Sequence, residues 1–112
     1  MTAMANGNQQ TIPMGDPPRN VDEAVNRLIS ELPLRYAAKI AKMNGRDLSA
    51  LHATIGPYIR ESFGLWRGND QLMESCRMFN DHDYLHIDSA SMVIMEALWA
   101  RLKKTYAIRA VK

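Results

Sequence analysis

The sequence is poor in cysteine and has no long apolar run, and each absence excludes a class of protein. Cys76 is the single cysteine among 112 residues, so the chain can form no internal disulfide and offers no paired thiols for structural zinc. No apolar stretch approaches the roughly 20 residues of a membrane-spanning helix. The first residues also lack the basic and apolar segments of a secretory signal. We therefore expect a cytoplasmic protein without a membrane span or cofactor.

The composition is that of one small folded domain. Hydrophobic residues make up 46% of the chain, which is enough for a single modest core. The formal net charge of +2 is too small to indicate a partner by itself. Residues 1–18 are polar, contain no apolar period, and are predicted to form a flexible arm. We expect a helical domain at 19–106 and a carboxyl-terminal tail at 107–112.

Apolar residues recur at helical spacing in five segments. Asn20 lies three residues before Glu23, a capping pattern that predicts a first helix to about Leu32. Pro33 suits the first turn of a second helix ending near Asn44, and Asp47 is predicted to cap a third. Asn69 is predicted to cap a fourth helix with Leu72, Met73, Cys76 and Phe79 on its apolar face. The fifth is expected from Ser89 to about Tyr106.

Two of these helices have informative details. Pro57 lacks an amide hydrogen and predicts a bend in the third helix, and Gly64 is the expected left-handed stop. The fifth helix is apolar around most of its circumference, which is typical of a central helix. Tyr84, Leu85 and Ile87, just before it, are expected to turn inward. The sequence therefore predicts an all-α compact bundle of about five helices with a central carboxyl-terminal helix.

A row of unlike residues runs along the third helix beside its apolar stripe. His52, Gly56 and Arg60 follow one another at four-residue intervals, so they share one face of the helix. Glycine at this place leaves room for another backbone, an aromatic ring or a ligand. Alternatively, Arg60 and His52 bond to nearby acids or carbonyls and hold polar segments in place.

The segment 80–88 carries residue types that bind metals, but in a weak pattern. His82 and His86 are four residues apart, yet the segment reads as a loop and lacks an HExxH motif, so we assign no metal. Asp88 is instead expected to cap the fifth helix through its carboxylate. Ser89 and Ser91 are read as ordinary helix-start serines rather than nucleophiles, and Cys76 as an inert core thiol.

Four basic residues form a stripe that we place on the second helix. Arg35, Lys39, Lys42 and Arg46 project within about 60° of one another by helical geometry. Such a stripe can lie along a phosphate backbone. It has no interleaved aromatic side chains, which nucleic-acid surfaces commonly use for stacking, so a solvated or intermolecular face is favoured.

Two segments resemble a known family. The first carries Leu51, His52, Gly56, Ile59, Arg60, Phe63, Gly64, Leu65, Trp66 and Asn69, and the second Leu85, His86, Asp88, Ala90, Ser91 and Ile94. Together they resemble a family of small bacterial domains of unknown function with an "IRN.FGLW..N" turn and a later "HPDD.S..I" segment. The resemblance spans about residues 21–102. It departs at Glu61, Ile87 and Ser89, where family members carry asparagine, proline and aspartate.

The resemblance implies a bacterial cytoplasmic protein and supplies no activity. If the shared pattern marks a binding site, its polar positions here are His52, Arg60, Trp66, Asn69, His86, Asp88 and Ser91. We expect the two segments to meet in space, because both flank apolar stripes of one core.

Three functions are compatible with the sequence. The favoured one is a non-enzymatic interaction module that binds another protein or itself through Trp66 and the polar row. The second is a ligand-binding or catalytic domain with a pocket formed by His52, Arg60, His86 and Asp88. The third, least favoured, is nucleic-acid binding through the basic stripe.

Overall fold

The computed structural model describes residues 16–79 and 85–111, with side chains described as far as Tyr106. Within these residues the backbone forms five helices and no strand, so the prediction of an all-α single-domain bundle is confirmed. The helices are α1 (Val21–Glu31), α2 (Leu34–Ala41), α3 (Gly45–Ser62), α4 (Asp70–Phe79) and α5 (Ile87–Val111).

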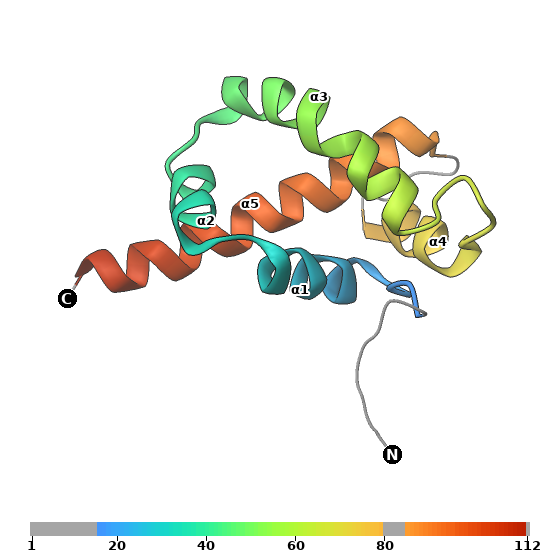
Figure 1. Cartoon of the computed structure of the whole chain (residues 1–112), viewed down its shortest axis with the longest axis horizontal. Helices are drawn as coiled ribbons and strands as arrows, with labels where there is room; N and C mark the ends of the chain where they lie inside the picture. The colour runs from blue at the N-terminus through green and yellow to red at the C-terminus, as the bar shows by residue number, and fades with distance from the viewer. Residues whose placement is uncertain (1–15, 80–84, 112) are drawn as a thin grey trace, which may run out of the picture.

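Helix α5 lies at the centre of the bundle, as its apolar circumference predicts. It contacts each of the other four helices, and Figure 1 shows α3 on one side of it and α1 on the other. Ile94, Met95 and Leu98 are fully buried along its middle. The indole Nε1 of Trp99 donates to the carbonyl of Met43 at 3.0 Å, which fixes the α2–α3 connection onto α5. One helix therefore supports all the others.

The first two helices begin close to where the sequence predicts. The Asn20 side chain accepts a hydrogen bond from the Glu23 amide at 2.8 Å, which confirms the predicted cap of α1. Pro33 lies one position before the first residue of α2, and its carbonyl accepts from the amides of Tyr36 and Ala37. Proline fits there because this position donates no helical hydrogen bond.

The start of α3 differs from the prediction. Asp47 does not cap this helix, because α3 already begins at Gly45 and its cap is Asn44. The Asn44 side chain accepts from the Asp47 amide, and the Asp47 carboxylate accepts from the Asn44 amide, both at 3.1 Å. In this reciprocal capping box two side chains each accept a hydrogen bond from a backbone amide, whereas the prediction assumed a single capping side chain. Arg46 consequently belongs to α3, and its expected place on the second helix is wrong.

The turn from α3 to α4 follows the sequence closely. Helix α3 continues through Pro57 to Ser62, and Gly64 adopts a φ of 70°, which confirms it as the left-handed stop. The Asn69 side chain accepts from the Leu72 amide at 3.3 Å, consistent with the predicted cap of α4. Leu72 and Cys76 are buried, but Phe79 is largely exposed, contrary to its expected place on the apolar face.

Helix α5 starts earlier than predicted and ends later. It begins at Ile87, so Asp88 lies inside its first turn and is not the cap. The position before the helix belongs to His86, whose Nδ1 accepts from the Asp88 amide at 3.2 Å. An imidazole nitrogen here replaces the expected carboxylate. The helical backbone continues through Val111, past the end predicted near Tyr106.

The amino-terminal arm was predicted to extend to residue 18. Pro18 is fully buried, and its carbonyl accepts a hydrogen bond from Asn69 Nδ2 at 2.9 Å. Leu85, expected to turn inward, is buried. The rest of the expected arm, residues 1–15, and Tyr84 lie outside the described residues. None of the five helices described combines the length and apolar character that crossing a bilayer requires.

Candidate functional site

Four of the predicted site residues meet where α3 crosses the first turn of α5. We call His52, Arg60, Asp88 and Ser91 the serine cluster. The Ser91 hydroxyl lies 2.7 Å from His52 Nε2 and 3.1 Å from Arg60 Nη1. It donates to the Asp88 carbonyl at 2.9 Å. Arg60 Nη1 also lies 3.5 Å from Asp88 Oδ1. The two segments that the sequence suggested would meet are joined through this hydroxyl.

Gly56 is the reason that His52 and Arg60 can reach the same serine. A Cβ atom at position 56 would lie 2.8 Å from His52 Cδ2 and 3.0 Å from Arg60 Nη1. Carbon atoms do not approach so closely without one of them moving. The glycine thus leaves space for side chains of its own helix, rather than for a ligand or for Trp66.

The hydrogen bonds of the cluster are saturated. A serine hydroxyl has one hydrogen and two lone pairs. Since Ser91 donates to the Asp88 carbonyl, its two lone pairs face Arg60 Nη1 and His52 Nε2, and the histidine tautomer with its hydrogen on Nε2 completes the set. Ser91 is 0% exposed. A nucleophilic serine needs a free lone pair and access to substrate, and this hydroxyl has neither.

The charges around the cluster favour a neutral histidine. Burial lowers the pKa of His52, the nearby Arg60 guanidinium lowers it further, and Asp88 opposes both. The Arg60 side chain is only 16% exposed, whereas that of Asp88 is 67% exposed. The outer end of the ion pair is therefore solvated, and its inner end is held by the serine.

The other three predicted site residues lie elsewhere or serve the backbone. Asn69 Nδ2 donates to the carbonyls of Pro18 and Phe63, so this side chain ties three segments together. His86 is exposed and bonds to the backbone of its own turn. Trp66 is 58% exposed, and its Nε1 donates to Glu61 at 3.2 Å. Arg67 pairs with the same carboxylate.

The described residues offer little for metal or thiol chemistry. Among them, no group of three histidine, cysteine or acidic side chains is placed to hold a metal ion. Asp81, His82 and Asp83, on which the metal hypothesis partly rests, lie outside the described residues. Burial raises the pKa of the Cys76 thiol to about 12, so this side chain is protonated at neutral pH.

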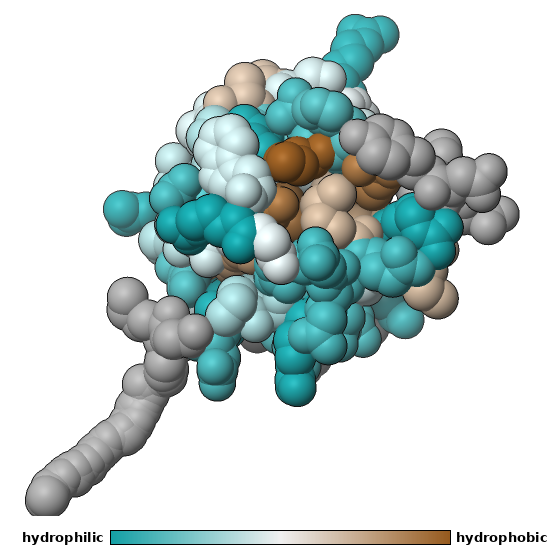
Figure 2. Space-filling view, turned by 90° about the vertical axis from the view of Figure 1, so that its right-hand side faces the viewer, coloured by the Kyte–Doolittle hydropathy of each residue, from teal (hydrophilic) through white to brown (hydrophobic). Residues whose placement is uncertain are grey.

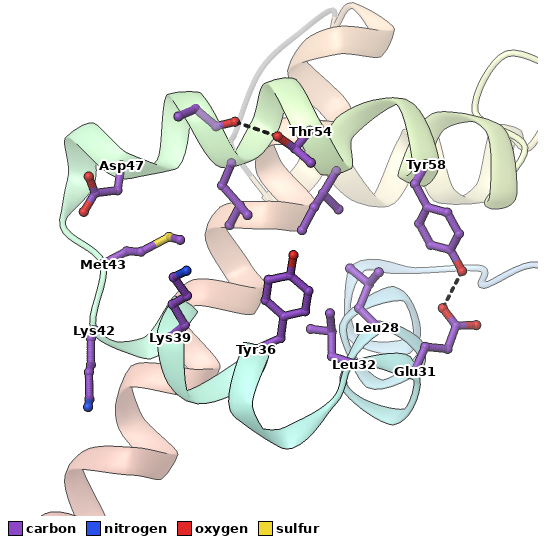
Figure 3. A pocket seen from close by; sticks show the side chains of 13 residues that line it. Leu28, Glu31, Leu32, Tyr36, Lys39, Lys42, Met43, Asp47, Thr54 and Tyr58 are labelled. Carbon is purple, nitrogen blue, oxygen red and sulfur yellow. Dashed lines mark hydrogen bonds between the residues drawn. The ribbon is translucent and has the colours of Figure 1, made fainter.

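Sequence reasoning missed an open groove on the neighbouring face of α3. We call it the apolar groove: a hollow of about 870 Å³ between α1 and α2 on one side and α3 on the other (Figure 3). It is lined by Leu28 of α1 and by Leu32 just after that helix, by Tyr36 of α2, and by Leu51 and Ile55 of α3. Helical spacing predicts an apolar stripe on this helix, made of Leu48, Leu51, Ile55, Ile59 and Phe63. Of these, Leu51 and Ile55 are only partly buried. The helical spacing of apolar residues does not predict how completely each one is buried.

The groove is bounded at both ends. The α2–α3 connection, with Met43, closes one end. At the other end the Tyr58 hydroxyl donates to the Glu31 carboxylate at 2.6 Å, which joins α3 to α1 (Figure 3). This hydrogen bond is the main cause that raises the pKa of Tyr58. Between these ends α1 and α2 make few or no contacts with α3, although all three pack on α5.

Two members of the basic stripe lie at this groove. All four members, Arg35, Lys39, Lys42 and Arg46, are exposed, and Lys39 and Lys42 line the hollow itself. No described acid forms an ion pair with either lysine. The two acids that line the groove are already bonded: Glu31 to Tyr58, and Asp47 within the capping box. Two lysines and two acids therefore line the groove beside its apolar side chains, and among the described residues the lysines are the pair without a bonding partner.

The end of the molecule around α4 offers a less defined surface. Figure 2 looks at this end and shows a small group of hydrophobic side chains among mainly hydrophilic ones. Met78 and Phe79 are exposed at the end of α4. They directly precede residues 80–84, which are not described, so the apolar groove is the better defined candidate.

Comparison with known proteins gives a family but no activity. A family model described as a domain of unknown function, DUF6794, matches residues 17–102. This range covers most of the chain and nearly all of the helical domain. No curated protein and no solved structure matches the chain.

Proposed function

We propose that this chain, which belongs to the family of domains of unknown function DUF6794, is a non-enzymatic module that binds a protein segment in the apolar groove. The observation that carries the proposal is the partial burial of Leu51 and Ile55 beside the exposed Tyr36. Apolar side chains left uncovered in a groove between helices are typical of surfaces that receive an amphipathic helix.

The binding surface in this proposal differs from the one that the sequence favoured. Trp66 and the polar row were expected to form it, but Trp66 is bonded to Glu61 in its own turn, and the row is saturated by Ser91. The groove instead offers tyrosine, leucine and isoleucine side chains with unpaired lysines beside them. Tyrosine is enriched at protein interfaces because one ring supplies both apolar area and a hydroxyl.

The alternative functions draw less support from the geometry. A pocket formed by His52, Arg60, His86 and Asp88 is not favoured, because three of these groups bond to Ser91 or to one another, and His86 bonds to its own turn. Nucleic-acid binding through the basic stripe would leave the neighbouring apolar groove unused. The proposal retains a bacterial cytoplasmic setting, which rests on the single cysteine and the resemblance of the two segments.

Site-specific photocrosslinking tests the proposal. A photoreactive benzoylphenylalanine replaces Thr54, which is exposed and lines the groove, or Ala53, which is exposed on the same helix but does not line it. We expect a protein adduct from position 54 alone, in cells that express the chain natively. The adduct should disappear when Ala50, another exposed lining residue, is changed to Gln. Equal adducts from both positions, or none, would contradict the proposal.

Light scattering then separates the two kinds of partner. An adduct of twice the chain mass, together with a dimer in solution that Ala50→Gln dissociates, identifies a second copy of this chain. Ala53→Gln is the matched control, since it adds the same side chain to α3 outside the groove. A monomer with a heterologous adduct identifies a separate partner protein.

A further inference from the structure

We infer that the occupant of the apolar groove is an acidic amphipathic helix of another protein. The inference rests on the proposed function and adds the chemistry of the partner. Three observations carry it: the state of the charges that line the groove, the length of its α3 wall, and the side chains along its floor.

The acidic and basic side chains that line the groove differ in whether they have bonding partners. Glu31 and Asp47 have hydrogen-bond partners within the fold, whereas Lys39 and Lys42 have no acid within ion-pair distance among the described residues. Lys39 and Lys42 lie on the same side of the groove, at the end of α2 and just after it. In Figure 3 the Lys39 side chain points toward the hollow and that of Lys42 points away from it. A partner carboxylate on this side can pair with Lys39 directly, and a second can pair with Lys42 once that exposed side chain turns toward the groove, without breaking any existing ion pair. A basic partner meets repulsion at the same positions.

The α3 wall has the length of a short helix. It runs from Asp47 to Tyr58, which at 1.5 Å per residue is about 16 Å. A helix of roughly three turns therefore matches it, with apolar residues at intervals of three and four facing Leu51 and Ile55. Lys39 lies in the last turn of α2 and Lys42 is the residue that ends this helix, three positions later, so carboxylates one turn apart on the incoming helix can meet both.

The test uses two synthetic helical peptides that share their leucine positions. One carries glutamate at every flanking position and the other carries lysine, and binding to the full chain is measured by fluorescence anisotropy. We expect the glutamate peptide to bind at least about tenfold more tightly at low ionic strength, and the preference to shrink as salt rises. Equal affinity, a preference for the lysine peptide, or binding of neither peptide overturns the inference.

Charge variants of the protein locate the preference. Lys39→Glu combined with Lys42→Glu should reverse the order of the two peptides. The matched control combines Arg67→Glu with Lys104→Glu, two exposed positions outside the groove, and should preserve that order at the same net charge. If the reversed charges disturb α2, Lys39→Ala combined with Lys42→Ala replaces that variant. It should abolish the preference for the glutamate peptide. A preference that survives removal of both lysines contradicts the inference.

Two further outcomes separate this inference from the proposed function. If both peptides bind equally and Ala50→Gln with Thr54→Gln abolishes both, the groove receives helices without charge selection, and only the acidic partner is refuted. If neither peptide binds but the adduct at position 54 forms, the partner is not an acidic helix and the interaction module remains. Binding of decanoate in the groove, with neither peptide binding, refutes the acidic helix in favour of a small amphipathic anion.

Discussion

Two adjoining faces of α3 differ in how completely their side chains are buried and bonded within the fold. On one face, His52 and Arg60 close over Gly56 and bond to a serine that is 0% exposed. On the other, Leu51 and Ile55 border a groove that neither α1 nor α2 fills. The residues alternate along the same turns of the helix, so local conformation does not explain the contrast. What differs is the partner: α5 covers the first face, whereas none of the helices that the structure describes fully covers the second.

This contrast shows that polar residues of α3 stabilise the fold, while apolar residues of the same helix stay partly exposed to solvent. A polar group buried with all its hydrogen bonds made contributes to stability and leaves nothing for a ligand. Apolar surface left in water retains a favourable free energy of burial that a partner can recover. Residue types common in active sites thus form the structural part of α3, and two of its aliphatic residues are the ones that the fold leaves partly uncovered.

The largest expected effect comes from removing the hydroxyl that joins the serine cluster. Ser91→Ala leaves His52 and Arg60 without their shared acceptor, so the free energy of unfolding should fall by about 2 kcal/mol. Urea denaturation followed by circular dichroism measures it. Ser89→Ala, an exposed position in the same turn, should change stability by less than about 0.5 kcal/mol. Equal effects would mean that the cluster is not a structural unit.

The next effect compares one substitution at two glycines of α3. Gly56→Ala puts a methyl group within 3.0 Å of His52 and Arg60 atoms, and we expect it to lower the free energy of unfolding by about 1 kcal/mol. Gly45→Ala meets no atom within 4 Å and should raise it by a few tenths, since alanine restricts the unfolded chain. Thermal denaturation of both variants gives the difference. Similar melting temperatures would show that the cluster yields to the added carbon.

A smaller effect follows from the lowered pKa of His52. The unfolded histidine has a pKa of about 6.5, and burial with the Arg60 charge lowers the folded pKa. Between these values the unfolded chain binds more protons, so stability falls as pH decreases from about 6.5 through the folded pKa. Because the ring is partly exposed, the loss should stay below about 1 kcal/mol. Denaturation of His52→Gln between pH 7.5 and 5 should lack this component, and an identical profile would contradict it.

The smallest effect is expected at Trp66. Its side chain is 58% exposed and donates one hydrogen bond to an exposed glutamate, so Trp66→Ala should cost less than about 1 kcal/mol. Partner binding should be unchanged in this variant and lost in Ala50→Gln, when both are measured in one crosslinking experiment. Loss of binding in Trp66→Ala alone would contradict the groove and would indicate that the interaction surface is the turn that carries Trp66.

Features that depend on a few consecutive residues were predictable. The Asn20 cap and the stop at Gly64 follow from side-chain oxygen positions and from the ease with which glycine adopts positive φ. Predicted helix starts were wrong where two capping residues competed. Asn44 precedes Asp47 and forms a box with it, and His86 takes the cap position expected for Asp88. The predicted cap was displaced by three residues at α3 and by two at α5, and both helices remained in place.

Features that depend on distant segments were only partly predictable. The four-residue spacing of His52, Gly56 and Arg60 correctly indicated one face, but it did not distinguish a pocket from a saturated cluster, because that depends on Ser91. The stripe through Leu51 and Ile55 correctly indicated an apolar face. Periodicity states which residues share a face and not whether another helix reaches it. Nothing in the sequence indicated that α1 and α2 stop short of α3.

The sequence alone determined the helices, their order and the central position of α5, because these follow from local capping and from how much of each helix is apolar. Only the tertiary structure decided which polar residues are satisfied and which apolar ones remain open. That division depends on the positions of helices around α5, set by packing between residues far apart in the chain.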